Sequence, residues 1–159
     1  MTVPDIFLFH ADYTRNMALP PSAYQQWKEA APELVSIEVM EATRESSVTE
    51  TQGTAVQLRR TRIQVEAKAR VISVERTAAG LQAGAEITLR YSHTPLSQQR
   101  LLDGKWVEAL IAGPSPIPIL EKGDKVTAWL RQVSGADYEP AAEAESFAVI
   151  PPPPTPKTD

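Results

Sequence analysis

The feature that most constrains the fold is one long stretch of alternating residues, which runs from Ala55 to Arg76. Apolar side chains occupy one parity of this stretch and polar side chains occupy the other. The apolar set is Ile63, Val65, Ala67, Ala69 and Val71, and the polar set is Arg62, Gln64, Glu66, Lys68 and Arg70. Alternation with a period of two is typical of a strand with one buried face, so the sequence predicts a single long β-strand here.

The alternation changes parity near Val71-Ile72, because Ile72 and Val74 carry the apolar pattern on the opposite set. A strand cannot do this without an irregularity, so we predict a bulge or a sharp bend at this dipeptide. A long, bent strand can take part in two sheets, and this is one way in which a small barrel closes.

A short helix is expected before the strands begin. Ser22 is the expected N-cap, and Tyr24, Trp27 and Lys28 lie about one helical turn apart. Pro32 should end the helix, because the residue that precedes a proline disfavours helical geometry.

After the helix the apolar period changes to two. From Leu34 onward, Val35, Ile37 and Val39 share one parity, as in a half-buried strand. Residues 43–54 are polar and rich in Ser, Thr and Glu, and they predict a mobile loop.

Two later phrases share one pattern: a leucine, two residues, a glycine, two more residues and then an alternating apolar strand. They begin at Leu81 and Leu120, and we interpret them as equivalent turn-plus-strand units. The strand residues are Ile87, Leu89 and Tyr91 in the first unit, and Val126, Ala128 and Leu130 in the second. Further strands are expected at 106–111 and 146–150, whereas the prolines of 113–118 prevent regular pairing there.

These segments predict a mainly β fold with five or six strands: a small closed or partly open antiparallel OB-like barrel with one short N-terminal helix. A length of 159 residues suits a single domain with additional chain at its ends. We therefore expect an extended N-terminal arm at 1–20, the barrel at 21–150 and a proline-rich tail at 151–159, with the loop around Gly135, Tyr138 and Pro140 before the last strand.

Residues 63–147 resemble the OB-fold barrels of the netrin-like, tissue-inhibitor-like group. The resemblance depends on the strand Ile63–Val74, the strand starts at Leu81 and Leu120, and the closing Tyr138-Glu139-Pro140 and Ser146-Phe147. It implies a non-enzymatic module of the kind found in exported or extracellular proteins. The protease-inhibiting members use an N-terminal cysteine and disulfides, and this chain has no cysteine, so their mechanism cannot be transferred to it.

Composition excludes several kinds of chemistry. Without cysteine there are no disulfides, thiolate metal sites or cysteine nucleophiles. The net charge of −4 argues against a general nucleic-acid binder. No apolar run approaches the roughly 20 residues of a membrane helix, so no membrane insertion is expected. The apolar residues Ile6 to Phe9 follow Asp5 and have no basic segment before them, so they do not form a signal peptide. Two compartments remain open: the protein is cytoplasmic, or it is an exported domain that lacks its leader.

Catalytic and metal motifs are scarce. The two histidines are His10 and His93, and neither accompanies a nucleophile motif such as Gly-x-Ser-x-Gly. The sets His10, Asp12 and Met17, or His93 with Asp103, lack a recognised ligand spacing, so neither a metal nor another cofactor is predicted.

The most distinctive surface feature is a basic stripe. Six cations against Glu66 and Glu75 give a charge of +4 over residues 59–76, so the rest of the chain sums to −8. The candidate binding residues are Arg59, Arg60, Arg62, Lys68 and Arg70, together with Trp129. The stripe has three interpretations: a solvated face partnered by acidic neighbouring strands, a docking surface for an acidic protein, or an OB-type surface for single-stranded nucleic acid. Trp129 lies on the parity opposite to its apolar neighbours, so it is either an exposed contact residue or covered by the N-terminal arm or helix.

We therefore expect a non-catalytic binding or scaffold module that acts through the barrel surface and the two extended ends. A single-stranded nucleic-acid binder is the first alternative, although nucleic acid is the less expected partner because no aromatic residue lies among the arginines. The second is an enzyme with an unrecognised carboxylate site at Glu108, Asp124 or Asp137. The tail could also bind a partner, since Pro151 and Pro154 have PxxP spacing, or serve as a linker.

Overall fold

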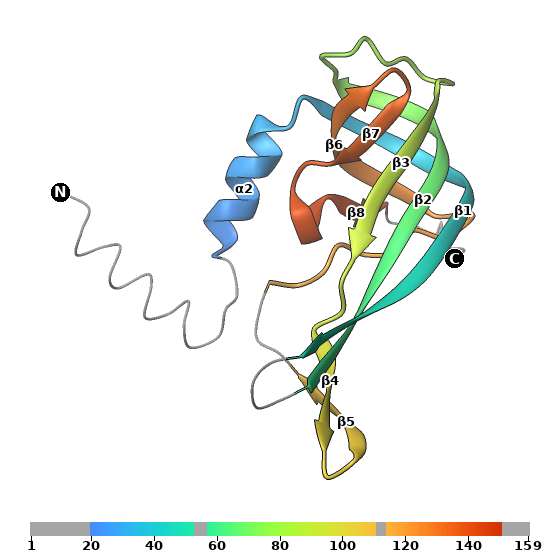
Figure 1. The fold of residues 1–159 in the computed structure, drawn as a ribbon. Helices are drawn as coiled ribbons and strands as arrows, with labels where there is room; N and C mark the ends of the chain where they lie inside the picture. The colour runs from blue at the N-terminus through green and yellow to red at the C-terminus, as the bar shows by residue number, and fades with distance from the viewer. Residues whose placement is uncertain (1–19, 53–56, 111–113, 151–159) are drawn as a thin grey trace, which may run out of the picture.

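The fold in the computed structural model is mainly β, with one α-helix and eight strands among the residues that it describes, which are 20–52, 57–110 and 114–150 (Figure 1). The helix is α2 (Pro21–Ala30), and a 3₁₀ turn, η1, spans Glu143–Glu145. The strands are β1 (Glu33–Gln52), β2 (Gln57–Arg76), β3 (Glu86–His93), β4 (Ser97–Leu102), β5 (Lys105–Leu110), β6 (Lys125–Ser134), β7 (Asp137–Pro140) and β8 (Phe147–Val149). The expected N-terminal arm, apart from Pro20, and the expected tail lie outside the described residues.

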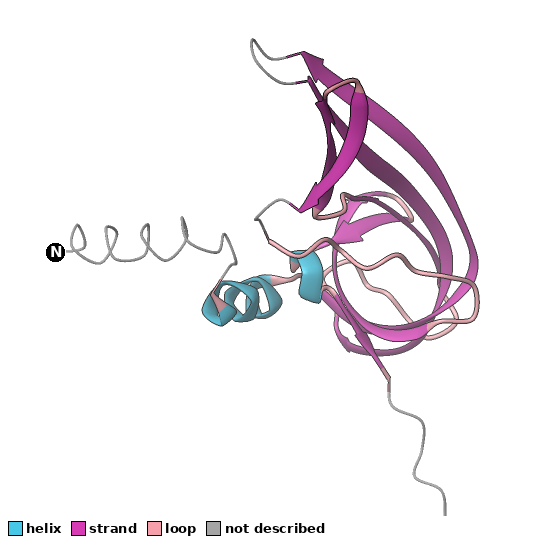
Figure 2. Cartoon of the chain, turned by 90° about the horizontal axis from the view of Figure 1, so that it is seen from below, coloured by secondary structure: helices cyan, strands magenta, loops and turns pink. Residues whose placement is uncertain are grey.

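Five strands form a ring, in the order β1, β6, β7, β3 and β2, which closes where β2 pairs with β1. All neighbours in the ring are antiparallel except β3 and β7, which are parallel. Those two strands pair only at Thr88–Asp137 and Leu89–Tyr138, so the ring is uneven and partly open. Figure 2 shows the strands curling around this ring, with α2 at one side. The expectation of a small, mainly β, partly open barrel is confirmed.

The core lies inside the ring and consists mainly of the apolar side chains that alternate along each strand. The sixteen residues of this cluster are Val35, Ile37, Val39, Val65, Ala67, Ala69, Val71, Ile87, Leu89, Tyr91, Leu120, Val126, Ala128, Leu130, Tyr138 and Phe147. The alternation in the sequence predicted nearly all of the strand residues in this set. Burial of this apolar surface is the main favourable contribution to folding.

The expected irregularity in the long strand is present at Ile72. Val71 pairs with Ile37 and Ser73 pairs with Ser36, which leaves Ile72 without a partner in β1 and 44% exposed. In a regular strand Val71 and Val74 would point to opposite faces. The extra residue shifts the alternation by one, so Val74 packs against the core as Val71 does. β1 has a matching irregularity, because Val39 pairs with Ala69 and Glu41 with Lys68.

Each Leu-x-x-Gly turn docks on one of these irregularities. The Gly84 N–H donates to the Val71 carbonyl at 2.7 Å, and the Val71 N–H donates to the Ala85 carbonyl at 2.8 Å. In the same way, Gly123 and Asp124 bond to both backbone groups of Val39, at 2.9 and 2.8 Å. The interpretation of the two phrases as equivalent turn-plus-strand units is therefore confirmed.

Beyond the barrel, β1 and β2 continue as a twisted hairpin (Figure 1). β4 joins it through the pairs Leu58–Arg100 and Arg59–Gln99, and β5 pairs along the other side of β4. We call this projecting unit, made of residues 47–52, 57–62, β4 and β5, the arm sheet. The prediction of a mobile loop at 43–54 was wrong for 43–52, which are strand. Polar Ser and Thr are compatible with a strand, and pairing with β2 continues regularly along this stretch.

The predicted strand count was too low, because β4 and β7 were not expected. β7 has only four residues and lies in the segment that Gly135 and Pro140 marked as a loop. β4 is polar, with the sequence SQQRLL, and lacks an apolar alternation. Both exist because a neighbouring strand offers them backbone partners, which a single-sequence pattern does not reveal.

The helix ends where it was predicted to end but begins differently. Pro20 occupies the N-cap position and Pro21 is the first helical residue, so the prediction of Ser22 as N-cap was wrong. A proline suits the first helical position because its fixed φ is already helical and its missing N–H has no partner there in any case. At the other end, Ala31 adopts an extended geometry before Pro32, as expected.

Candidate functional site

The structure divides the basic stripe of β2 between two faces and two regions. Arg60, Arg62, Lys68 and Arg70 share the parity that faces away from the core, and all four are exposed. Arg59 has the other parity and therefore lies on the opposite face of the sheet. Lys68 and Arg70 belong to the barrel, whereas the remaining three belong to the arm sheet.

In the barrel, the two cations have acidic neighbours on both sides. Arg70 lies between Glu38 of β1 and Glu86 of β3, and its Nη2 lies 3.8 Å from Glu86 Oε1. Lys68 lies directly opposite Glu41. Opposite charges on adjacent strands largely cancel at the surface, so this part of the stripe is a mixed, solvated face.

The arm sheet differs, because two further cations from β4 and β5 share the face of Arg60 and Arg62. Leu58 pairs with Arg100, and Arg100 pairs in turn with Val107. Directly paired residues and every second residue along a strand share a face. The described side chains of β2, β4 and β5 on this face are Leu58, Arg60, Arg62, Gln98, Arg100, Leu102, Lys105, Val107 and Ala109. We call this set the basic arm face.

The basic arm face combines four cations with exposed apolar side chains. Ser47 and Thr49 of β1 complete it, and none of its described strand residues is acidic. Leu102 is 49% exposed and Val107 is 45% exposed. Sequence analysis missed Arg100 and Lys105, because they follow the end of the stripe at Arg76 by 24 and 29 residues and Arg100 is on an unexpected strand.

Two cations of this face also contact the barrel. Arg62 donates from Nε and Nη2 to Ser92 Oγ, at 3.1 and 3.0 Å. Arg60 lines a hollow of about 200 Å³ where the arm sheet meets the barrel, together with the crossing segment 114–117. Glu143 lines the same hollow, and Glu45 of β1 lies on the same side of the sheet, two residues before Ser47.

Arg59 is engaged on the opposite face of the arm sheet. Its Nη2 lies 2.8 Å from Glu50 Oε1, and its guanidinium lies 3.9 Å from the centre of the Trp106 ring. The stacked arginine thus links β1, β2 and β5, a structural contact of a kind that stabilises by about 0.5–1 kcal/mol at exposed sites. Of the predicted binding residues, Arg59 therefore lies apart from the other arm cations.

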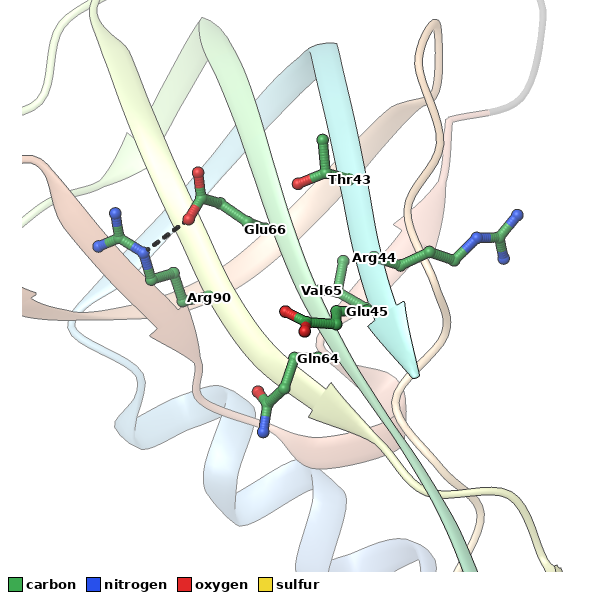
Figure 3. Close-up of a pocket in the computed structure, with 7 residues that line it drawn as sticks. All are labelled: Thr43, Arg44, Glu45, Gln64, Val65, Glu66 and Arg90. Carbon is green, nitrogen blue, oxygen red and sulfur yellow. Dashed lines mark hydrogen bonds and ion pairs between the residues drawn. The ribbon is translucent and has the colours of Figure 1, made fainter. Parts of the chain in front are cut away.

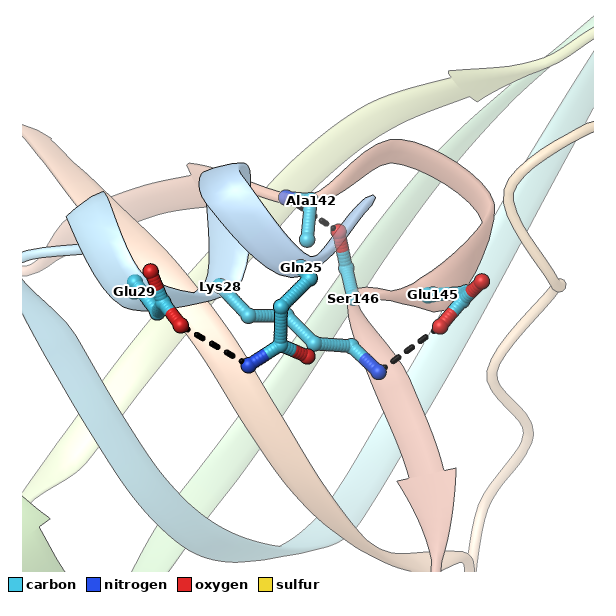
Figure 4. A network of polar contacts seen from close by, with 6 residues as sticks. All are labelled: Gln25, Lys28, Glu29, Ala142, Glu145 and Ser146. Carbon is cyan, nitrogen blue, oxygen red and sulfur yellow. Dashed lines mark hydrogen bonds and ion pairs between the residues drawn. The ribbon is translucent and has the colours of Figure 1, made fainter. Parts of the chain in front are cut away.

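Trp129 is half-buried beneath the helix rather than open to a partner. Lys28 Nζ lies 4.8 Å from the centre of its ring and also forms an ion pair with Glu145 at 2.7 Å. Figure 4 shows this ion pair between α2 and η1, beside the bond from Ala142 N–H to Ser146 Oγ. The expected cover of Trp129 is thus supplied by the helix; the arm proposed for that role lies outside the described residues.

A polar hollow of about 430 Å³ lies over β1, β2 and β3 (Figure 3). Arg90 dominates it, with its Nε 3.1 Å from Glu66 Oε2 and its Nη1 2.8 Å from Asp137 Oδ2. The hydrogen bonds that Arg90 donates to Glu66 and then to Asp137 raise the pKa of Arg90 above its ordinary value. Arg90 is thus paired with two carboxylates of the protein. A ligand in this hollow would therefore meet less net charge than on the basic arm face.

Two buried polar groups have protein partners. Tyr91 Oη donates to the Pro118 carbonyl at 2.7 Å and accepts from the Leu120 N–H at 2.9 Å, and burial raises its pKa to about 12. The Glu33 carboxylate accepts hydrogen bonds from Thr77 Oγ1 and from the N–H groups of Ala78 and Ala79. Both groups have their hydrogen-bond partners within the protein. Tyr91 attaches the segment 118–120 to the barrel, and Glu33 attaches residues 77–79.

The carboxylates proposed for an unrecognised active site lie on separate elements. Glu108 is on β5, Asp124 accepts from the Glu121 N–H in the turn before β6, and Asp137 pairs with Arg90. His93 Nδ1 lies 2.7 Å from the Ile117 carbonyl. Over residues 20–52, 57–110 and 114–150, no three His, Asp or Glu side chains are grouped so that they could hold a metal ion.

Comparisons with known proteins do not narrow the function. The chain matches no model of a protein family, and neither a curated protein nor a solved structure matches it. In the part of the chain that the structure describes, no helix is both long enough and apolar enough to cross a membrane. The basic arm face is therefore the candidate site that the geometry itself brings out.

Proposed function

We propose that this chain is a non-catalytic binding module that docks an acidic protein partner on the basic arm face. The observation that carries the proposal is the gathering of Arg60, Arg62, Arg100 and Lys105 on one face whose described strand residues include no carboxylate. The chain as a whole is acidic, with a net charge of −4, so this local reversal of sign distinguishes the face from the rest of the molecule.

The composition of the face suits a protein partner. Exposed arginines and a lysine favour encounter with an acidic surface and fix its orientation. Leu102 and Val107 supply apolar area that a partner could bury, at roughly 25 cal/mol per Å². Arginine is also enriched at protein interfaces relative to the rest of the surface.

The OB-like interpretation of the fold supports the same location. OB folds are partly open five-stranded barrels that bind their ligands on the face of the second and third strands and at the loop between the first and second. The ring here has five strands, and the arm sheet extends from β1 and β2. The narrower netrin-like resemblance stays a prediction.

Single-stranded nucleic acid is the second candidate, because cations line an extension of a barrel. Proteins that bind single strands also stack the bases on aromatic side chains. On the arm sheet, Trp106 lies on the opposite face, where Arg59 covers its ring. We therefore favour the protein partner.

Two double variants test the proposal with labelled poly-L-glutamate as the probe. Arg60→Glu with Arg100→Glu reverses the arm cations, and Lys68→Glu with Arg70→Glu is the matched control with the same change in net charge. We expect fluorescence anisotropy to show salt-sensitive binding that the arm variant loses and the barrel control largely keeps, since Glu38, Glu41 and Glu86 already offset the barrel cations.

Equal effects of the two double variants, or no binding at low salt, would overturn the proposal. A labelled oligothymidine that binds more tightly than poly-L-glutamate would favour the nucleic-acid candidate instead. Circular dichroism of each variant checks that the sheet is intact.

A further inference from the structure

We propose that the partner binds as an extended segment that adds a strand to the free edge of β5, with acidic side chains over the basic arm face. This inference rests on the proposed function and specifies the form of the partner. It identifies the backbone of β5, and not only the cations, as a binding surface.

The outer edge of β5 is regular and open. β5 is the last strand in the sheet order, and its six residues form consecutive antiparallel pairs with β4 without a register shift. In the described parts of the chain, no strand pairs with its other side. Such an edge presents a row of unpaired N–H and C=O groups, which is a template for strand addition.

The side chains of β5 specify what kind of strand would fit. Lys105 and Val107 lie on the basic arm face, and Trp106 and Glu108 lie on the other face. A residue directly opposite on an added strand would place its Cβ about 4.5–5.5 Å away. A fitting segment therefore alternates, with acidic residues on the basic arm face, opposite Lys105 and Val107, and apolar residues on the other face, opposite Trp106.

Charge also selects between the two edges of the arm sheet. The other edge is β1, whose residues 47–52 carry Glu50 and no cation, and whose barrel part carries Glu41 and Glu45 against Arg44. An acidic segment would be repelled there and attracted at β5, where Lys105 lies on the strand itself and Arg100 on the next strand. An acidic extended segment is thus the occupant that complements the β5 edge.

Strand addition to β5 is tested with a short peptide of alternating valine and glutamate. Three forms are compared: unmodified, N-methylated at every valine, and N-methylated at every residue. In a strand, alternate N–H groups point to opposite edges, so methylation at valine leaves one edge able to pair and full methylation leaves none. We expect the first two forms to bind and the third to bind at least about tenfold more weakly, in keeping with the loss of several backbone hydrogen bonds.

Hydrogen exchange and a charge variant complete the experiment. Peptide binding should slow amide exchange in residues 105–110. Lys105→Glu should weaken peptide binding about tenfold or more, whereas the matched control Lys122→Glu, on a barrel turn, should leave it unchanged.

The inference fails separately from the proposed function. Suppose that all three peptides bind with equal affinity and that the Arg60→Glu, Arg100→Glu variant still fails to bind poly-L-glutamate. Docking then occurs through charge alone, and strand addition is wrong. Failure of every peptide to bind at millimolar concentration would also overturn strand addition. Dimers that form through β5, detected by light scattering and by slowed exchange at 105–110 without peptide, would show that a second copy occupies the edge instead.

Discussion

At the scale of single residues, Tyr91 links the core to the segment that crosses back from the arm. Its hydroxyl group donates to Pro118 and accepts from Leu120, although its ring belongs to the buried cluster. The proline-rich segment lacks a regular strand partner, so this one side chain supplies bonds that a sheet would otherwise provide.

Tyr91→Phe should lower the free energy of unfolding by about 1–3 kcal/mol, because the Leu120 N–H loses its acceptor in a buried place. The raised pKa adds a pH dependence. The folded state holds the Tyr91 proton up to about pH 12 and the unfolded chain up to about pH 10, so this part of the stability is complete below pH 10 and is lost as the pH rises toward 12.

Urea unfolding at neutral pH and above pH 10, for both proteins, measures this effect. The difference in stability between the parent protein and Tyr91→Phe should shrink in the alkaline range. A constant difference across that range would show that Tyr91 does not titrate as its burial requires.

At the scale of elements, α2 is attached to the barrel by side chains from distant strands and turns. Arg76 at the end of β2 donates to the carbonyls of Ala31 and Lys28, at 2.9 and 2.7 Å. These are carbonyls at the end of the helix, which lack partners within it. Lys28 in turn reaches Trp129 and Glu145. The helix thus depends on the barrel more than on its own propensity.

Arg76→Ala should loosen α2 and leave the barrel core intact. We expect a loss of about 1–2 kcal/mol from the two hydrogen bonds, with faster amide exchange in residues 23–30 and little change in residues 65–71. Arg131→Ala, which removes an exposed ion pair with Glu139, is the matched control and should cost less than about 1 kcal/mol. Equal exchange in both variants would contradict this role.

At the scale of the whole molecule, the chain consists of a barrel with a core and an arm sheet without one. The buried cluster lies within the ring, and in the arm sheet no side chain that the structure describes is fully buried. The arm is held by backbone pairing, by the Arg59–Trp106 stack and by Arg62 on Ser92. It is therefore the part whose stability depends least on apolar burial.

Native-state hydrogen exchange should separate the two parts. Amides of β4, of β5 and of residues 57–62 should exchange through local opening at a lower free energy than those of residues 65–71 and 87–91. The denaturant dependence of exchange measures this difference. Arm amides that exchange only with global unfolding would show that the arm and the barrel form one cooperative unit.

The bend, the core parity and the two turn units could be predicted from the sequence because each follows from neighbours along the chain. The change of parity near Val71 required an extra residue, although the prediction that Ile72 joins Val74 on the apolar side was wrong, since Ile72 is itself the extra residue and is 44% exposed. Gly84 and Gly123 take positive φ angles of 92° and 94° that glycine adopts readily. Of the candidate site, Arg60 and Arg62 were predicted as members of the basic stripe, but their neighbours in the arm sheet were not.

What only the tertiary structure decided was which strands lie side by side. Alternation along one strand determines which side chains share its face, since successive residues point to opposite sides. It does not determine the neighbour across the sheet, because that depends on the register between segments far apart in the chain. That register placed Glu41 beside Lys68, brought Arg100 and Lys105 to the face of Arg60, and brought Trp106 to Arg59 on the opposite face.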